Sequence, residues 1–388
     1  MVAFLAIFLF LYGLMHAYIL VRARIALELG LGSFLPLVFF MVLMIWAPII
    51  VRIFEKAGLA LWARVAAFVG YAWMGLAFLI VASLVIVDLF RLMLFLLSTT
   101  LQRDLSFLMP PPGPSFKISL LCVVLVSLYG WFEARAIRTE RIVVRSPKIS
   151  AGTSPLRIVQ ISDVHLGLIV RQDRLKRIME QVRKASPDLM VSTGDLVDGE
   201  MNDLDGVADL LNEVKPKYGT FAVTGNHEFY AGLDQALAFT RRAGFRVLRG
   251  EAVTIPGTIT IVGVDDPSGP GYRSSNSGEG ALLSKAASGT FTLFLKHRPD
   301  IAREGIGLFE LQLSGHLHDG QIFPFRLLVR LFYPHIAGLR ALPGGAFLYV
   351  SRGSGTWGPP IRFLAPPEVT IIDLVHANPT SRNAGNAR

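Results

Sequence analysis

The sequence is poor in cysteine and in charge. Its 388 residues include one cysteine, Cys122, so the chain can form no internal disulfide and no metal site built from cysteine thiolates. Charged residues make up 17% of the chain, whereas an average soluble protein has about a quarter. With 52% hydrophobic residues and a mean hydropathy of +0.49, the composition excludes a disordered, a collagen-like and a fully soluble protein.

The net charge of +9 is unevenly distributed. Residues 134–150 hold five Lys and Arg against one acidic residue, whereas residues 151–388 hold 25 against 23. Because the C-terminal part is nearly neutral, we expect no nucleic-acid partner. A short basic run directly after an apolar segment is typical of chain that lies beside anionic lipid headgroups.

Apolar segments in the first third of the chain are long enough to cross a bilayer, which takes about 20 residues. The predicted spans lie near residues 2–21, 34–53, 65–87 and 118–132. The first has no basic residue before Arg22, so we interpret it as a retained helix and not as a cleaved signal peptide. A further apolar run at residues 91–101 either extends the third helix or lies along the membrane interface.

The basic residues beside the predicted spans favour one orientation. Eight Lys and Arg lie on the side of the C-terminal region and five on the other, which predicts a cytoplasmic C-terminal region. Among ionisable residues, His16 alone lies well inside a predicted span. A single histidine there is more typical of hydrogen-bonded packing than of a proton pathway.

From Leu156 onward, short β-like runs alternate with amphipathic helical stretches at residues 172–185 and 207–214. The predicted strands are residues 157–162, 189–193, 220–224, 258–264, 290–296 and 310–314. This alternation predicts a layered α/β domain whose site forms where the strands end. The predicted organisation is a transmembrane region at 1–133, a basic juxtamembrane linker at 134–154, the α/β domain at 155–376 and a disordered tail at 377–388.

Side chains that can bind a metal ion follow all but one of these strands. They are Asp163, His165, Asp195, Asn226, His297, His316 and His318, with His227 beside them. Each alone is commonly a cap, a turn or a buried polar residue, but together they have no packing rationale, because buried unpaired polar groups are costly. Seven ligands exceed the needs of one tetrahedral ion. They predict two ions that share a carboxylate and hold a hydroxide for in-line attack at phosphorus.

The mixture of imidazole and carboxylate ligands favours Mn, Fe or Zn over a site made only of oxygen ligands. His227 follows a predicted ligand directly and is left free. A histidine with a pKa near neutrality is suited to protonate the leaving group.

The motifs Asp-x-His, Gly-Asp, Gly-Asn-His-Glu, a lone histidine and Gly-His-x-His resemble those of the calcineurin-like metallophosphoesterase family, over roughly residues 156–374. The resemblance implies a four-layer α/β/β/α sandwich that follows a bundle of about four transmembrane helices. It implies that one ion is held by Asp163, His165, Asp195 and His318. The second ion would be held by Asp195 as the bridge, Asn226, His297 and His316, and His227 would be the general acid.

The segments GNHEFYAG and GHLHDGQIFPF are similar to those of the membrane-anchored bacterial branch of that family. This similarity implies a multi-pass protein of a bacterial inner membrane with its catalytic domain in the cytoplasm. The branch usually has Thr and Gly where this chain has Leu317 and Asp319. Neither position is a ligand, but Asp319 brings a further carboxylate close to the site.

After Gln321 the chain reads IFPFRLLVRLFYPHIAGLRALPGG, in which arginines are spaced among large apolar residues. The run is either a core insertion, a loop over the site or an interfacial segment; the last suits an anionic lipid. With the apolar helices, it predicts a lipid-linked phosphoester substrate, in line with a similarity to UDP-2,3-diacylglucosamine pyrophosphatases. Arg298 and Arg352 are the candidate phosphate contacts.

Two alternatives stay open. The protein is a general nucleotide phosphodiesterase or phosphatase whose helices serve only as an anchor, or it is a catalytically silent membrane sensor or scaffold. The presence of every ligand and of His227 argues against the silent scaffold.

Overall fold

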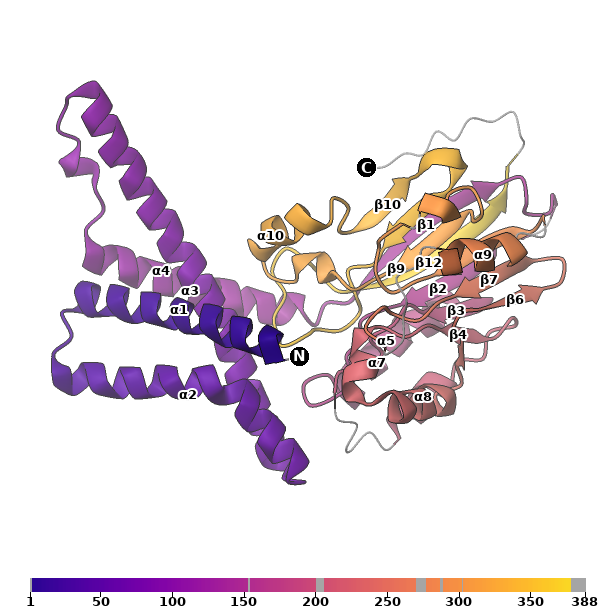
Figure 1. The fold of residues 1–388 in the computed structure, drawn as a ribbon, viewed down its shortest axis with the longest axis horizontal. Helices are drawn as coiled ribbons and strands as arrows, with labels where there is room; N and C mark the ends of the chain where they lie inside the picture. Colours follow the sequence, from indigo (N-terminus) through magenta and orange to yellow (C-terminus); the bar gives the residue numbers. More distant parts are fainter. Residues whose placement is uncertain are drawn as a thin grey trace. The chain divides into compact units, whose positions relative to one another are not determined.

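The computed structural model describes residues 2–152, 154–199, 206–269, 277–286, 289–301 and 303–377. The chain divides into two compact units (Figure 1). The first contains Met1–Phe132 and Gly358–Phe363, and the second contains Glu133–Trp357 and Leu364–Arg388.

Within the described residues, the first unit has four helices that are long and apolar enough to cross a membrane, as predicted. They are α1 (Val2–Leu27), α2 (Leu31–Lys56), α3 (Ala60–Leu101) and α4 (Pro112–Glu133), with the short 3₁₀ helix η1 (Ser106–Leu108) between the last two. Helix α4 begins earlier than the predicted span at residue 118, because proline is tolerated in the first turn of a helix.

Helix α3 is longer than a bilayer is thick. Its 42 residues correspond to about 63 Å at 1.5 Å per residue, roughly twice the hydrocarbon thickness of about 30 Å. The apolar run at residues 91–101 therefore extends the third helix. Near it, the Asp88 carboxylate forms ion pairs with Arg22 and Arg91 and accepts a hydrogen bond of 2.7 Å from the Tyr18 hydroxyl.

Both ring nitrogens of His16 are hydrogen-bonded inside the first unit. Nδ1 lies 2.7 Å from the carbonyl oxygen of Tyr12, and Nε2 accepts a bond of 2.9 Å from the indole N–H of Trp73. The side chain is buried. These contacts agree with the interpretation of His16 as a packing residue.

The segment Gly358–Phe363 packs among the helices of the first unit. The backbone N–H of Arg362 donates to the carbonyl oxygen of Gly130 at 3.0 Å, and the ring of Phe363 meets that of Tyr129 edge to face. Arg362 and Ile361 are buried. A segment more than 200 residues later in the sequence therefore completes the packing of α4.

Gly130→Ala is expected to destabilise this unit. A Cβ at Gly130 would lie 2.8 Å from the backbone oxygen of Arg362, and overpacking of this kind costs about 1–3 kcal/mol. Gly13→Ala in α1 is the matched control, because a Cβ there meets no atom within 4 Å. Thermal unfolding of the full chain in detergent should show a lower Tm for Gly130→Ala only; equal Tm values would contradict the packing.

Within its described residues, the second unit contains two six-stranded sheets. The first sheet has the order β1 (Arg138–Ser146), β12 (Glu368–His376), β2 (Leu156–Ile161), β3 (Leu189–Ser192), β4 (Thr220–Ala222) and β5 (Arg246–Val247). The second has the order β10 (Gly338–Ala341), β11 (Phe347–Val350), β9 (Leu311–Ser314), β8 (Phe291–Leu295), β7 (Ile259–Gly263) and β6 (Glu251–Ile255).

The strands that lead into the site run parallel. In the first sheet β2, β3 and β4 are parallel neighbours, with Ile158 opposite Leu189 and Met190 opposite Thr220. In the second sheet β7, β8 and β9 are parallel neighbours. Parallel strands end at the same edge of a sheet, so the loops that follow them gather there.

Three apolar layers hold the second unit together. Helices α5 (Gln172–Ala185), α6 (Val207–Asn212) and α8 (Leu233–Arg242) pack on the outer face of the first sheet. The inner faces of the two sheets share a second layer, and α9 (Ser277–Ala286) packs on the outer face of the second sheet. The order helix, sheet, sheet, helix confirms the predicted fold class (Figure 1).

The predicted linker differs from the structure, because residues 138–146 form β1 and pair in parallel with β12. The side chains of β1 alternate between exposed and buried toward its end, and its three arginines obscured that period in the sequence. Of the predicted tail, only Ala377 lies within the described residues. The other predicted strands match β2, β3, β4, β7, β8 and β9 to within two residues at each end.

Candidate metal centre

The predicted ligands lie in the loops that follow five parallel strands. Asp163 and His165 follow β2, Asp195 follows β3, Asn226 and His227 open α7 (Asn226–Ala231) after β4, His297 follows β8, and His316 and His318 follow β9. Three overlapping groups form, each with ligand atoms within 4.8 Å of one another. They are Asp163, His165 and His318; His165, Asp195 and His227; and Asp195, His297 and His316.

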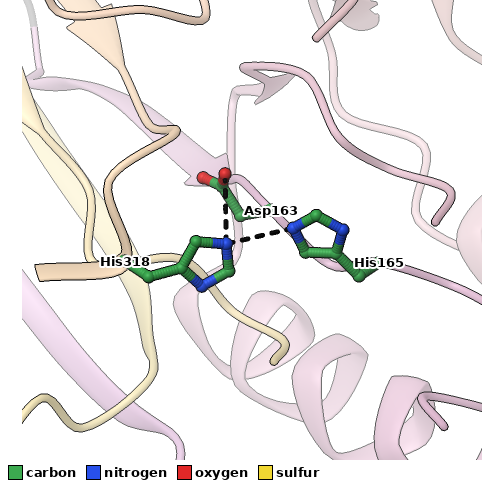
Figure 2. A group of neighbouring side chains, drawn as sticks. All are labelled: Asp163, His165 and His318. Atoms are coloured by element: carbon green, nitrogen blue, oxygen red, sulfur yellow. Dashed lines mark hydrogen bonds and ion pairs between the residues drawn. The ribbon is translucent and has the colours of Figure 1, made fainter. Parts of the chain in front are cut away.

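The first group surrounds the ring of His318. Its Nε2 lies 3.0 Å from Nε2 of His165 and 3.5 Å from Oδ1 of Asp163. Figure 2 shows the His318 side chain meeting those of Asp163 and His165, which share the loop after β2, with its nitrogen directed toward both partners. All three residues are buried.

The other two groups share the carboxylate of Asp195. Oδ2 of Asp195 lies 3.2 Å from Nε2 of His297 and 3.7 Å from Nε2 of His165. Nδ1 of His316 lies 3.1 Å from the same nitrogen of His297. The Asp195 carboxylate therefore lies near both His165 and His297, as a ligand that bridges two ions must.

The donor set fits divalent ions. Two ring nitrogens bound to one ion at about 2.1 Å, with a tetrahedral angle between them, lie about 3.4 Å apart, close to the 3.0 and 3.1 Å between the histidine pairs. Oδ1 of Asn226 is buried and has no hydrogen-bond partner, and a buried unpaired acceptor is costly unless an ion or another donor meets it.

The backbone is constrained at these residues. Asp163, His165, Asp195, His316 and His318 all adopt positive φ angles between 49° and 74°. Non-glycine residues rarely do so, and such conformations persist only where the surroundings enforce them, commonly at functional sites. The glycines of the motifs make room for the ligands, because a Cβ at Gly225 would clash with the Asp195 carboxylate and one at Gly315 with that of Asp163.

Glu228 holds two of these loops in place, a role that the sequence did not indicate. Its buried carboxylate accepts hydrogen bonds from the backbone N–H groups of Asp195 at 3.0 Å, Leu196 at 2.8 Å and Gly225 at 2.6 Å. The glutamate of the Gly-Asn-His-Glu motif therefore fixes the backbone on which Asp195 and Asn226 sit.

Asp198 is a second residue that sequence reasoning missed. Its Oδ1 lies 3.0 Å from Nδ1 of His227 and 3.3 Å from Nδ1 of His165, and its carbonyl oxygen lies 2.8 Å from the same His227 nitrogen. The available signal was a carboxylate three residues after the Gly-Asp motif. The rings of Tyr230 and Trp357 contact that of His227 edge to face.

The carboxylates make the site strongly attractive to positive charge. Burial lowers the pKa of His297, but the charge of Asp195 outweighs it and raises the pKa to about 10. Burial and the neighbouring His297 lower the pKa of His316 to about 3. The His316 ring is therefore neutral at physiological pH, the form in which histidine binds a metal.

The two arginines predicted to bind phosphate lie in different surroundings. Arg298 follows His297 and donates through Nε and Nη2 to the buried carboxylate of Asp266, at 2.7 and 3.0 Å. Arg352 forms ion pairs with Glu140 and, at 2.6 Å, with Glu368. The charge of Arg352 is thus matched by carboxylates on β1 and β12.

Asp319, the departure from the family pattern, forms an ion pair with Arg326 of helix α10 (Phe325–Phe332). The guanidinium of Arg326 also donates to the carbonyl oxygen of Leu364 at 2.8 Å. The carboxylate beside His318 is thus paired, and it anchors α10 next to the metal centre.

Comparisons with known proteins agree with this geometry. Residues 156–320 match the family described as Calcineurin-like phosphoesterase. An uncharacterized metallophosphoesterase of Aquifex aeolicus is 42% identical over 66% of this chain and 98% of its own length. One of Campylobacter jejuni is 33% identical over 67% and 69%. A zebrafish (Danio rerio) transmembrane protein with metallophosphoesterase domain is 30% identical over 67% and 62%. None of these names specifies a substrate.

Proposed function

Because this chain belongs to the calcineurin-like phosphoesterase family and is a metal-dependent phosphoester hydrolase, we propose that it cleaves a phosphodiester or pyrophosphate bond of a lipid-linked substrate. The observation that carries the chemistry is the convergence of buried aspartate and histidine side chains in overlapping groups. The lipid-linked substrate is supported by the four apolar helices of the same chain.

The proposed ligands of one ion are Asp163, His165, Asp195 and His318, and those of the other are Asp195, Asn226, His297 and His316. Two divalent ions bound there, with Mn, Fe and Zn as the candidates, would activate a water molecule and polarise the phosphoryl oxygens. The protein positions the ligands. Glu228 fixes the loops that carry them, and the backbone at the ligands with positive φ angles directs their side chains inward.

His227 is the proposed general acid. Asp198 binds its Nδ1 through both a carboxylate and a carbonyl oxygen, which leaves Nε2 as the nitrogen that can face a substrate. Burial lowers the pKa of His227, but Asp195 and Asp198 outweigh burial and raise it to about 10. The imidazolium is therefore protonated at neutral pH and can donate its proton to the leaving oxygen.

Arg298 remains the better proposed phosphate contact of the two arginines. It lies next to His297, and Asp266 holds its Nε and Nη2, so its orientation is fixed. A phosphate contact by Arg352 stays a prediction, because Glu140 and Glu368 already pair with its guanidinium. The bias of basic residues supports the proposed orientation, with the catalytic half in the cytoplasm, and the membrane proposed is a bacterial inner membrane.

The test is hydrolysis by the detergent-purified full chain with Mn²⁺. We expect cleavage of UDP-2,3-diacylglucosamine to exceed that of an aryl phosphodiester by several powers of ten, since an acylated substrate gains binding energy that a soluble ester lacks. Chelation of the metal should abolish both activities, and Mn²⁺ should restore them.

A soluble nucleotide serves as the second comparison. If the nucleotide is cleaved faster than the lipid, the protein is a nucleotide phosphodiesterase with a membrane anchor, and the lipid proposal fails. If the aryl ester alone is cleaved, the metal chemistry stands and this lipid is excluded as the substrate. If chelation leaves both rates unchanged, the metal assignment itself is contradicted.

A further inference from the structure

Helix α10 presents an apolar face to its surroundings. Leu331 and Phe332 are 77% and 80% exposed, and Leu327 and Leu328 on the preceding turn are 52% and 50% exposed. Residues three and four apart share one face of a helix, so these side chains form a continuous patch, here called the α10 face. Large apolar patches on a surface mark sites that bind a partner or a membrane.

The α10 face is held rigidly. Arg326, on the opposite side of the helix, pairs with Asp319 and donates to the Leu364 carbonyl oxygen. Val329 packs against the apolar cluster that includes Ile336 and Leu348. The exposed leucines therefore do not belong to a loose loop that could fold inward.

The α10 face also lies at the metal centre. The helix begins seven residues after His318, and Tyr333, which follows its last residue, contacts the His316 ring with 6.3 Å between ring centroids. A surface that covers α10 therefore lies close to the metal centre.

The charge around the α10 face points to one kind of partner. Residues 320–367 contain no aspartate or glutamate but five arginines. Two of them, Arg330 and Arg340, are exposed. An apolar face bordered by arginines matches the boundary between anionic headgroups and acyl chains.

A bilayer is also within reach of this unit through the chain itself. Helix α4, apolar enough to cross a membrane, ends at Glu133, and β1 begins at Arg138. Five residues of extended chain span at most about 18 Å, so only a short stretch of chain joins α4 to the first strand of this unit.

We propose that the α10 face inserts into the headgroup region of an anionic bilayer, the one that the chain's own helices cross, and so places the metal centre at the lipid surface. This inference goes beyond the proposed function, because it holds for any phosphoester that reaches the site from the membrane.

The test uses the single cysteine of the chain. In the Cys122→Ser background, Leu331→Cys is labelled with an environment-sensitive fluorophore, and the full chain is reconstituted into vesicles containing anionic lipids with brominated acyl chains. A label buried about 5–10 Å into the boundary should emit at shorter wavelength and lose about half of its intensity to the bromines. Lys184→Cys, exposed on α5, is the matched control and should show neither effect.

Three outcomes would overturn the proposal. A label at 331 that behaves like the one at 184 means that the face stays in water. A blue shift without quenching means that protein, such as a second copy, covers the face. Quenching at both positions means that the whole unit lies on the membrane without using α10.

Two further variants complete the test. Leu327→Cys, on the same face, replaces Leu331→Cys if that variant does not fold.

Arg330→Glu with Arg340→Glu should reduce quenching in anionic vesicles, while hydrolysis of a soluble aryl phosphodiester stays unchanged and reports an intact fold. Unaltered quenching would contradict the role of the arginines. Because quenching does not depend on turnover, its outcome is separate from that of the proposed function.

Discussion

Asp195→Ala should abolish turnover of every substrate. Its carboxylate is the proposed bridge and lies 3.2 Å from Nε2 of His297 and 3.7 Å from Nε2 of His165, so its removal takes a ligand from both proposed ions. Because bound ions supply several kcal/mol of transition-state stabilisation and each 1.36 kcal/mol is tenfold in rate, we expect a loss of about 10³-fold or more. The measurement is hydrolysis of an aryl phosphodiester at saturating Mn²⁺.

Two variants accompany this experiment. Asp195→Asn keeps the shape of the side chain, so inactivity in both variants cannot be assigned to misfolding, and both should bind less metal when the bound ions are counted. Asp234→Ala, on the exposed first turn of α8, is the matched aspartate control and should retain full activity. Retained activity of Asp195→Asn would contradict the shared-ligand assignment.

His227→Gln should slow hydrolysis by about 10²–10⁴-fold when the leaving group is an alkoxide, because general acid catalysis contributes about that much. A p-nitrophenolate leaves readily without a proton, so the loss should be far smaller for that substrate. His335→Gln, whose histidine bonds the Gly338 carbonyl oxygen outside the metal groups, is the control. An equal loss for both leaving groups would show that His227 is not the acid.

His227→Gln should also change how the hydrolysis rate depends on pH. The pKa of His227 is raised, so the wild-type rate should be constant at neutral pH and fall as pH rises through that pKa, when the proton is lost. Metal ions bound to Asp195 would neutralise part of its charge and so lower the pKa of His227. The fall in rate at alkaline pH should then lie below pH 10. This fall should be absent from the pH profile of His227→Gln with an alkyl ester.

The metal centre could be predicted from the sequence because the ligands closely follow strands, and three of them, Asp195, Asn226 and His316, directly follow a glycine. Gly225 and Gly315 have neighbours that exclude a Cβ, so the motif spacing records the geometry. Asp198 and Glu228 carry the same kind of information, but their roles become visible only when His227 and the Asp195 backbone lie beside them.

The parts that could not be predicted depend on distant segments. Strand β1 looks like a basic linker until β12, more than 220 residues later, provides its hydrogen-bond partner. The run after Gln321 allowed a core, a loop or an interfacial segment, and the exposure of α10 excludes the core. Local patterns predict local elements, whereas edge strands and surfaces are settled by tertiary contacts.

The packing of Gly358–Phe363 among the helices has a consequence for biogenesis. Helices α1 to α4 are made first, and Gly358 follows the end of α4 by 225 residues, which takes roughly 10–45 s at 5–20 residues per second. During that interval Gly130 and the rest of α4 lack the backbone of Arg362. The helices that enter the bilayer first therefore reach their final packing only after most of the catalytic half has been synthesised.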